Sequence, residues 1–240
     1  GVLQPNDETR PIPFQSARSY FTYDPASATL SFDELSVQSK WVSGRAEGKA
    51  ILIGMETGRP TQLQGQITMT GLQANPDDLY SAPVTLDGAQ MTFRLGLDPF
   101  DLTLGEASLL KDGHVVVADG RLVAEQKGWN LSVNGQVDDL SGETVLEFWP
   151  DRLVPKTRKW VADNIFQVML TNTQLALRAR PGAKPTVYLG SEFRDAEIKF
   201  LKTMPVLTGG AGRAELMGSR FVVTAAKGTV MAPQGGPLDV

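Results

Sequence analysis

The sequence predicts a mainly β protein, built as a long antiparallel sheet with one amphipathic α-helix near residues 155–165. Hydrophobic and polar residues alternate with a period of two along most of the chain, which is typical of strands with one hydrophobic face. The 24 Gly and 15 Pro residues are suited to many strands joined by turns. The 240 residues are enough for one large all-β domain or two smaller ones.

The alternating segments place hydrophobic side chains on one side only, which indicates an antiparallel sheet covered on one face. Dipeptides rich in Gly and Asp separate these segments and predict turns, among them Asp87-Gly88, Lys111-Asp112-Gly113 and Asn134-Gly135. The hydrophobic positions of the clearest alternations are Ile67, Met69, Met91, Phe93, Leu95, Leu131, Val133, Ile198, Phe200, Phe221 and Val223.

One segment, residues 150–166, has the periodicity of a helix instead. Pro155 is suited to a first helical turn, where its missing N–H removes no hydrogen bond. The basic residues Lys156, Arg158 and Lys159 are expected on the solvated side of this helix. The opposite side is formed at four-residue spacing by Leu153, Thr157, Val161 and Ile165.

The helix divides the chain into three expected parts. These are a strand-rich part at residues 1–148, the helical part at residues 149–167, and a second strand-rich part at residues 168–240. The first residues lack the basic start and apolar stretch of a signal peptide, and the last ones stop just after a turn signal. We therefore expect the chain to be a segment of a longer protein, with its second strand-rich part continuing beyond residue 240.

Composition excludes several classes of function. The 23 basic and 27 acidic residues give a net charge of −4, which argues against binding to nucleic acid. The absence of Cys excludes disulfides and thiolate nucleophiles, and a single His excludes a two-His metal site. Phosphate-binding loops, nucleophile elbows and dinucleotide fingerprints are missing as well. We therefore expect no catalytic residue, no cofactor and no metal.

Two further patterns have a structural interpretation. The carboxylate pairs Asp77-Asp78 and Asp138-Asp139 suggest a glycan-cleaving enzyme only remotely, because neighbouring residues on a strand point to opposite faces. The Gly-rich run from Thr208 to Gly212 lacks the Lys and the following helix of a phosphate loop, so it predicts a hairpin turn.

The hydrophobic face itself has two possible roles. In a closed sandwich such faces meet and form a core, whereas in an open sheet they line a groove. Burying one methylene contributes about 0.8 kcal/mol, so a 16-carbon chain in such a groove gains on the order of 13 kcal/mol before ordering costs. Periodicity alone does not separate the groove from the core.

The helical segment and its surroundings resemble AsmA-like proteins, in the YhdP-like branch. The signature consists of Trp149-Pro150, then Thr157-Arg158-Lys159-Trp160-Val161, then Asn164-Ile165. Residues 193–205, with a Met-Pro step, and the Gly-rich run after them resemble the family's strand repeat. The resemblance covers about residues 20–240. The family usually has Gly after Asn-Ile, where this chain has Phe166.

The resemblance implies a fold and a function. Such proteins form long, curved, taco-like β grooves with apolar interiors in the periplasm, anchored to the bacterial inner membrane by an N-terminal helix. They are held to carry phospholipid between the inner and outer membranes, which supports outer-membrane biogenesis and the barrier. The eleven hydrophobic positions given above then become groove-lining candidates for phospholipid acyl chains, and no catalytic residue is transferred. Trp149 and Trp160 are expected to fix the helix to the sheet.

An alternative function is a non-catalytic structural or scaffold β-domain of the bacterial envelope, with a closed core. An open groove also leaves edge strands, whose unpaired backbone groups make self-association possible. Membrane attachment is expected only through segments outside this chain.

Overall fold

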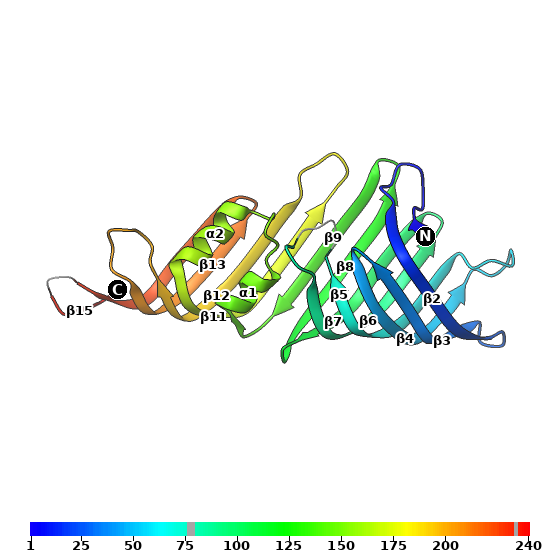
Figure 1. Ribbon diagram of the computed structural model, residues 1–240, viewed down its shortest axis with the longest axis horizontal. Coiled ribbons are helices and arrows are strands. Elements are labelled where there is room, and N and C mark those ends of the chain that lie inside the picture. The colour runs from blue at the N-terminus through cyan, green and yellow to red at the C-terminus, as the bar shows by residue number, and fades with distance from the viewer. Residues whose placement is uncertain (76–79, 233–234) are drawn as a thin grey trace. The chain divides into compact units, whose positions relative to one another are not determined.

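The computed structural model describes residues 1–75, 80–232 and 235–240, and it confirms the mainly β fold (Figure 1). Two short helices are present in the described residues, α1 (Gly142–Phe148) and α2 (Pro155–Asn164). The strands are β1 (Val2–Leu3), β2 (Ile12–Asp24), β3 (Thr29–Ser39), β4 (Val42–Ile53), β5 (Gln62–Ala74), β6 (Val84–Leu97), β7 (Phe100–Lys111), β8 (His114–Glu125), β9 (Gly128–Val137), β10 (Leu140–Ser141), β11 (Ile165–Ala179), β12 (Thr186–Ile198), β13 (Leu207–Met217), β14 (Arg220–Met231) and β15 (Pro237–Asp239).

The strands form one antiparallel sheet in which nearly every strand pairs with its neighbours in sequence. The order runs from β1 to β9 and then from β11 to β15, while the short β10 pairs with β11. Contacts divide the chain into two compact units. The first comprises residues 1–75, 82–135 and 177–185, and the second comprises residues 80–81, 136–176 and 186–240, as far as they are described.

The sheet of the first unit is strongly curled. The indole N–H of Trp129 on β9 donates to the carbonyl oxygen of Arg10 at 2.8 Å, and the amide of Asn6 donates to Glu125 O at 3.4 Å. Arg10 also lies over the ring of Trp41, 6.0 Å from its centroid. In a flat sheet, the seven strand-to-strand steps from β2 to β9 span about 33 Å. The few residues before β2 bridge this distance only because the sheet curls.

Mid-strand glycines allow adjacent strands of this curled sheet to approach closely. A Cβ added at Gly65 on β5 would lie 2.0 Å from Lys49 O and 2.8 Å from Ala50 Cα on β4. A Cβ at Gly48 on β4 would lie 2.2 Å from Gln66 O. Real Cβ atoms are not found at such distances from backbone, so any larger residue would force β4 and β5 apart.

The second unit contains both helices. The predicted helix at 155–165 is confirmed as α2, which begins at Pro155 and buries Val161. The expectation of one helix is incomplete, because α1 precedes it. The side chain of Ser141 accepts a hydrogen bond from Thr144 N and caps α1. Neither helix in the described part of the chain is long and hydrophobic enough to cross a membrane.

The residues of the family-like signature hold the corner between these helices. Arg158 donates to Leu146 O and Trp149 O, both at 3.0 Å, and pairs with Asp151 at 3.1 Å. These carbonyls lie at the end of α1, where no further helical N–H reaches them. The expectation that Arg158 faces solvent is therefore wrong: it joins α1 to α2. The indole N–H of Trp149 donates to Leu153 O at 2.6 Å and tightens the same corner.

Several predicted turns lie inside strands instead. Asp112-Gly113 is a turn between β7 and β8, as predicted. Asp87-Gly88 lies within β6, and Asn134-Gly135 lies within β9. The run from Thr208 to Gly212 is part of β13, where the register with β14 shifts. Its interpretation as a hairpin turn was therefore wrong.

Candidate functional site

Hydrophobic side chains form rows across the strands of the first unit. Paired residues of neighbouring strands lie on the same side of a sheet, so the register from β2 to β8 defines each row. One row holds Tyr23, Leu30, Ala50, Gly65, Phe93, Leu104 and Gly120. The next holds Phe21, Phe32, Gly48, Ile67, Met91, Ala107 and Ala118. A third holds Leu35, Ala46, Met69, Ala89, Leu109 and Val116. We call this side of β2–β8 the apolar face.

The other side of the same strands, which we call the polar face, is different in character. One of its rows holds Ser31, Lys49, Gln66 and Thr92. The Arg121 guanidinium on this side donates to the Asp101 carboxylate, and that hydrogen bond lowers the pKa of Asp101. The three rows of the apolar face contain no charged residue. The charged residues named here thus lie on the side of the sheet opposite the three hydrophobic rows.

The structure brings together the seven predicted residues of the first unit. Four of them, Ile67, Met69, Met91 and Phe93, lie in the three rows, and Leu95 lies in the adjacent row with Leu63, Leu102 and Leu122. On β9, a Cβ added at Gly120 would meet Val133 Cγ2 at 3.5 Å, so Val133 shares this face. Leu131 shares it by alternation along the strand.

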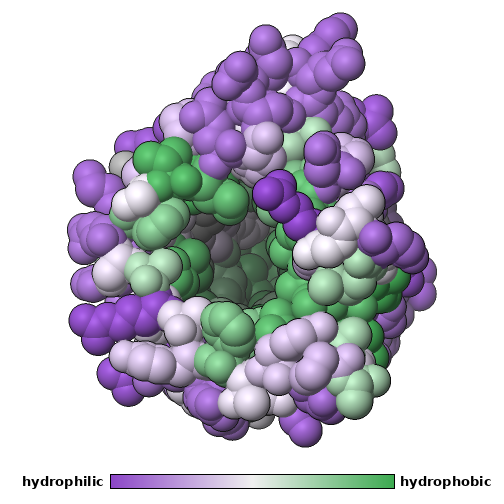
Figure 2. Space-filling model, turned by 90° about the vertical axis from the view of Figure 1, so that its right-hand side faces the viewer, coloured by the Kyte–Doolittle hydropathy of each residue, from purple (hydrophilic) through white to green (hydrophobic). Residues whose placement is uncertain are grey.

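All seven of these side chains are half-buried. The described residues of the first unit form only strands and their connections, so no helix of that unit covers them. Leu35, Ala46, Ile67 and Met69 line a pocket of ≈ 390 Å³ on this face. Figure 2 shows a hollow lined by hydrophobic residues and rimmed by hydrophilic ones. The face is therefore partly open.

Sequence reasoning missed other members of the apolar face. Phe21, Phe32, Leu104, Leu109 and Val116 lie in its rows but were not predicted. Bulges interrupt the alternation there: the inward positions of β3 step by three residues from Phe32 to Leu35. A bulge adds one residue and resets the period of two. These residues could have been found by testing, for each strand, both possible sets of alternate residues as the hydrophobic face.

The four predicted residues of the second unit have different surroundings. Ile198 is 1% exposed and lies in a core with Phe193 and Leu216. Phe200 follows the end of β12, so it is not a strand residue. The ring of Phe221 contacts Trp160 of α2 edge-on, with 5.7 Å between the ring centroids, and Val223 is half-buried on the same side of β14. Figure 1 shows α2 lying against the sheet of this unit. Here a helix covers the sheet.

Shortening the side chain of Ile198 should therefore destabilise the fold. We expect Ile198→Ala to lower the free energy of unfolding by about 2 to 5 kcal/mol, because it leaves a cavity in a packed core. Ile51→Ala is the matched control, since Ile51 is 52% exposed, and it should cost less than about 1 kcal/mol. Urea denaturation followed by circular dichroism measures both. Equal small losses would mean that Ile198 does not lie in a core.

The carboxylate pairs show no catalytic arrangement in the described part of the chain. Asp138 accepts a hydrogen bond from Asn172 N at 3.0 Å, and Asp139 accepts one from Arg194 at 3.3 Å. These contacts join the β9–β10 connection to β11 and β12. Asp77 and Asp78 lie outside the described residues. Within the described ranges, no three acidic, His or Cys side chains cluster in a way that could hold a metal ion.

Comparison with known proteins does not place the chain in a family. No family model matches it, and searches of curated proteins and of solved structures find no match. The geometry of the apolar face is therefore the basis on which a function can be proposed.

Proposed function

We propose that this chain is a segment of a periplasmic, AsmA-like lipid conduit, which carries phospholipid acyl chains along the apolar face of its first unit. The observation that supports the proposal is the set of hydrophobic rows that cross the strands from β2 or β3 to β8 and contain no charged residue. The family resemblance of residues 149–165 supports the periplasmic location. It also supports attachment to the inner membrane through segments outside this chain.

The dimensions of the apolar face suit an acyl chain. The six steps from β2 to β8 give the two rows that begin on β2 a length of about 29 Å along the sheet. One leaflet of a bilayer has a hydrocarbon depth of about 15 Å, so a row is longer than an extended acyl chain. Because each row runs across the strands, a chain shifted by one strand along a row exchanges one hydrophobic contact for another. Such a surface favours binding without fixing one position, as a conduit requires.

Movement along this face needs no catalytic group. Each methylene removed from water contributes about 0.8 kcal/mol wherever it lies on the face. A gradient or a partner outside this chain then determines the direction. Such transport between the inner and outer membranes would support outer-membrane biogenesis and barrier function.

A scaffold role is the second candidate, and the second unit favours it. There α2 covers the sheet, and Phe193, Ile198 and Leu216 form a closed core. A chain with this role would bind no lipid, and its first unit would be only a structural surface.

Native mass spectrometry of the purified chain tests the proposal. The protein is delipidated, mixed with phosphatidylethanolamine or phosphatidylglycerol, and measured against a lipid-free sample. We expect mass increments of one or more phospholipids, together with brighter fluorescence of a dye that reports exposed hydrophobic surface in the lipid-free sample. A folded chain that binds no phospholipid and leaves the dye dark would support the scaffold role instead.

A further inference from the structure

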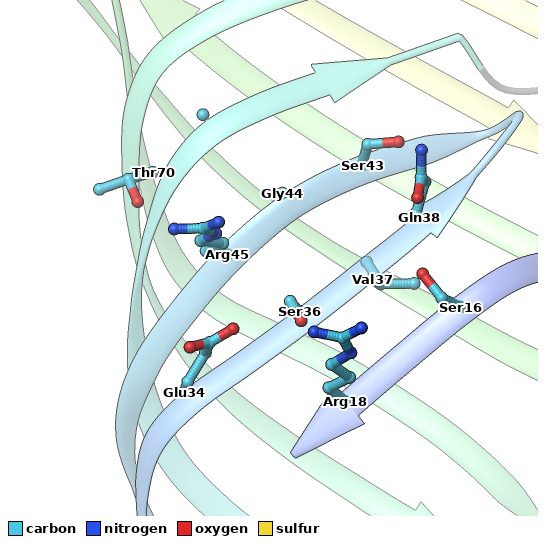
Figure 3. A pocket seen from close by; sticks show the side chains of 11 residues that line it. Ser16, Arg18, Glu34, Ser36, Val37, Gln38, Ser43, Gly44, Arg45 and Thr70 are labelled. Atoms are coloured by element: carbon cyan, nitrogen blue, oxygen red, sulfur yellow. The ribbon is translucent and has the colours of Figure 1, made fainter. Parts of the chain in front are cut away.

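A second concave site lies on the polar face of the first unit, across the sheet from the apolar face. It is a pocket of ≈ 580 Å³ over β2 to β5 (Figure 3). Arg18, Ser36, Arg45 and Thr70 lie in one row across these four strands. Glu34 lines the same pocket beside this row. The lining of the pocket therefore combines two positive charges, one negative charge and four hydroxyl groups, two of which lie in this row.

The row places the two arginines at a useful spacing. Arg18 and Arg45 lie two strands apart, which separates their backbones by about 10 Å. Figure 3 shows their side chains in the pocket, with Ser36 on the strand between them. An arginine side chain is long enough for both guanidinium groups to reach one anion above Ser36. A phosphate group offers several oxygens to such a pair, and guanidinium binds it through two parallel hydrogen bonds.

Within the described part of the chain, these two guanidinium groups are also unengaged. No hydrogen bond or ion pair involves the Arg18 or the Arg45 side chain there. By contrast, Arg121 pairs with Asp101, Arg194 with Asp139 and Arg213 with Glu192. A carboxylate thus neutralises each of these three strand arginines. The pair in the pocket keeps its hydrogen-bonding capacity for an external anion.

We propose that this pocket binds a phosphate group, held between Arg18 and Arg45 over the hydroxyl of Ser36. The group belongs either to free phosphate or to the headgroup of a phospholipid, since both present the same oxygens. Glu34 weakens the site, because its carboxylate repels the bound anion. This inference is independent of the proposed acyl-chain binding, which takes place on the opposite side of the sheet.

The first arm of the test uses inorganic phosphate at low ionic strength, measured by NMR shifts of the β2 to β4 amides. We expect Arg18→Gln and Arg45→Gln each to weaken binding about tenfold, as expected for the loss of a charge-assisted contact. Glu34→Gln should tighten binding several-fold. Met91→Glu, on the apolar face, is the control and should leave phosphate binding unchanged. Both arginines are exposed, so their substitution should leave the fold intact. Thermal melts verify that the variants fold.

The second arm uses flotation with vesicles of phosphatidylcholine alone or with added phosphatidylglycerol. If a headgroup is the ligand, the chain floats with vesicles, and Arg18→Gln/Arg45→Gln prevents it. Gln90→Glu is the control for this arm and should not prevent flotation, because Gln90 lies on the polar face of β6 and outside the pocket. If free phosphate is the ligand, only the first arm responds. The proposal is overturned if the double variant binds both phosphate and vesicles as the parent chain does, or if the parent chain binds neither. Loss of acyl-chain binding in Met91→Glu with the phosphate site intact would separate this inference from the proposed function.

Discussion

Met91→Glu is expected to weaken phospholipid binding by the folded chain at least tenfold, a loss of about 1.4 kcal/mol or more. Met91 lies in the middle of a row, between Ile67 and Ala107. A carboxylate at this position must either lose its hydration against the acyl chain or keep water on the apolar face. Both outcomes reduce the hydrophobic contact on which the proposed binding depends. The fold should persist, because Met91 is only half-buried.

Gln90→Glu is the matched control for this variant. Gln90 precedes Met91 on β6, faces the polar side and is exposed. It changes the net charge by the same amount, so a general electrostatic effect would appear in both variants. Native mass spectrometry at several lipid concentrations compares them, with circular dichroism as the test of folding. If both variants bind phospholipid like the parent chain, the apolar face is not the binding surface.

The alternation of hydrophobic and polar residues predicted the fold correctly, because it reflects a physical requirement: one side of each strand avoids water. It located Ile67 and Met91 on one face although they lie on different strands. It did not distinguish that face from the core around Ile198, because both show the same alternation. The two differ in whether a helix packs on the sheet. In the second unit α2 packs on it, whereas the described part of the first unit contains only strands and their connections. Coverage depends on tertiary structure, which local periodicity does not report.

Turn prediction failed for a related reason. Gly is favoured both in tight turns and in bulges, because both use backbone conformations that other residues avoid. Gly209 has a φ of 58° and lies within β13, where the register shifts. The same residue type would have been needed for the predicted hairpin turn. The short helix α1 was missed as well, since its seven residues give little periodicity and its signal is the cap at Ser141.

Gly65→Ala is expected to destabilise the first unit by about 2 to 3 kcal/mol, as overpacking against rigid neighbours does. The new methyl group would meet Lys49 O at 2.0 Å and Ala50 Cα at 2.8 Å, and backbone atoms yield less readily than the end of a flexible side chain. Relief requires β4 and β5 to separate, which breaks ladder hydrogen bonds between them. Hydrogen exchange of the β4 and β5 amides and urea denaturation measure the local and the global loss.

Gly88→Ala, on the adjacent strand β6, is the matched control for Gly65→Ala. Its added methyl group would lie 3.6 Å from Met69 O, an ordinary van der Waals distance. We therefore expect its stability to remain within about 0.5 kcal/mol of the parent chain, with a small gain possible because Ala restricts the unfolded chain. Equal effects of the two substitutions would show that loss of backbone freedom, and not close strand approach, accounts for Gly65. A selective loss at Gly65, with weaker lipid binding in the chains that remain folded, would connect the close approach of β4 and β5 to the shape of the apolar face.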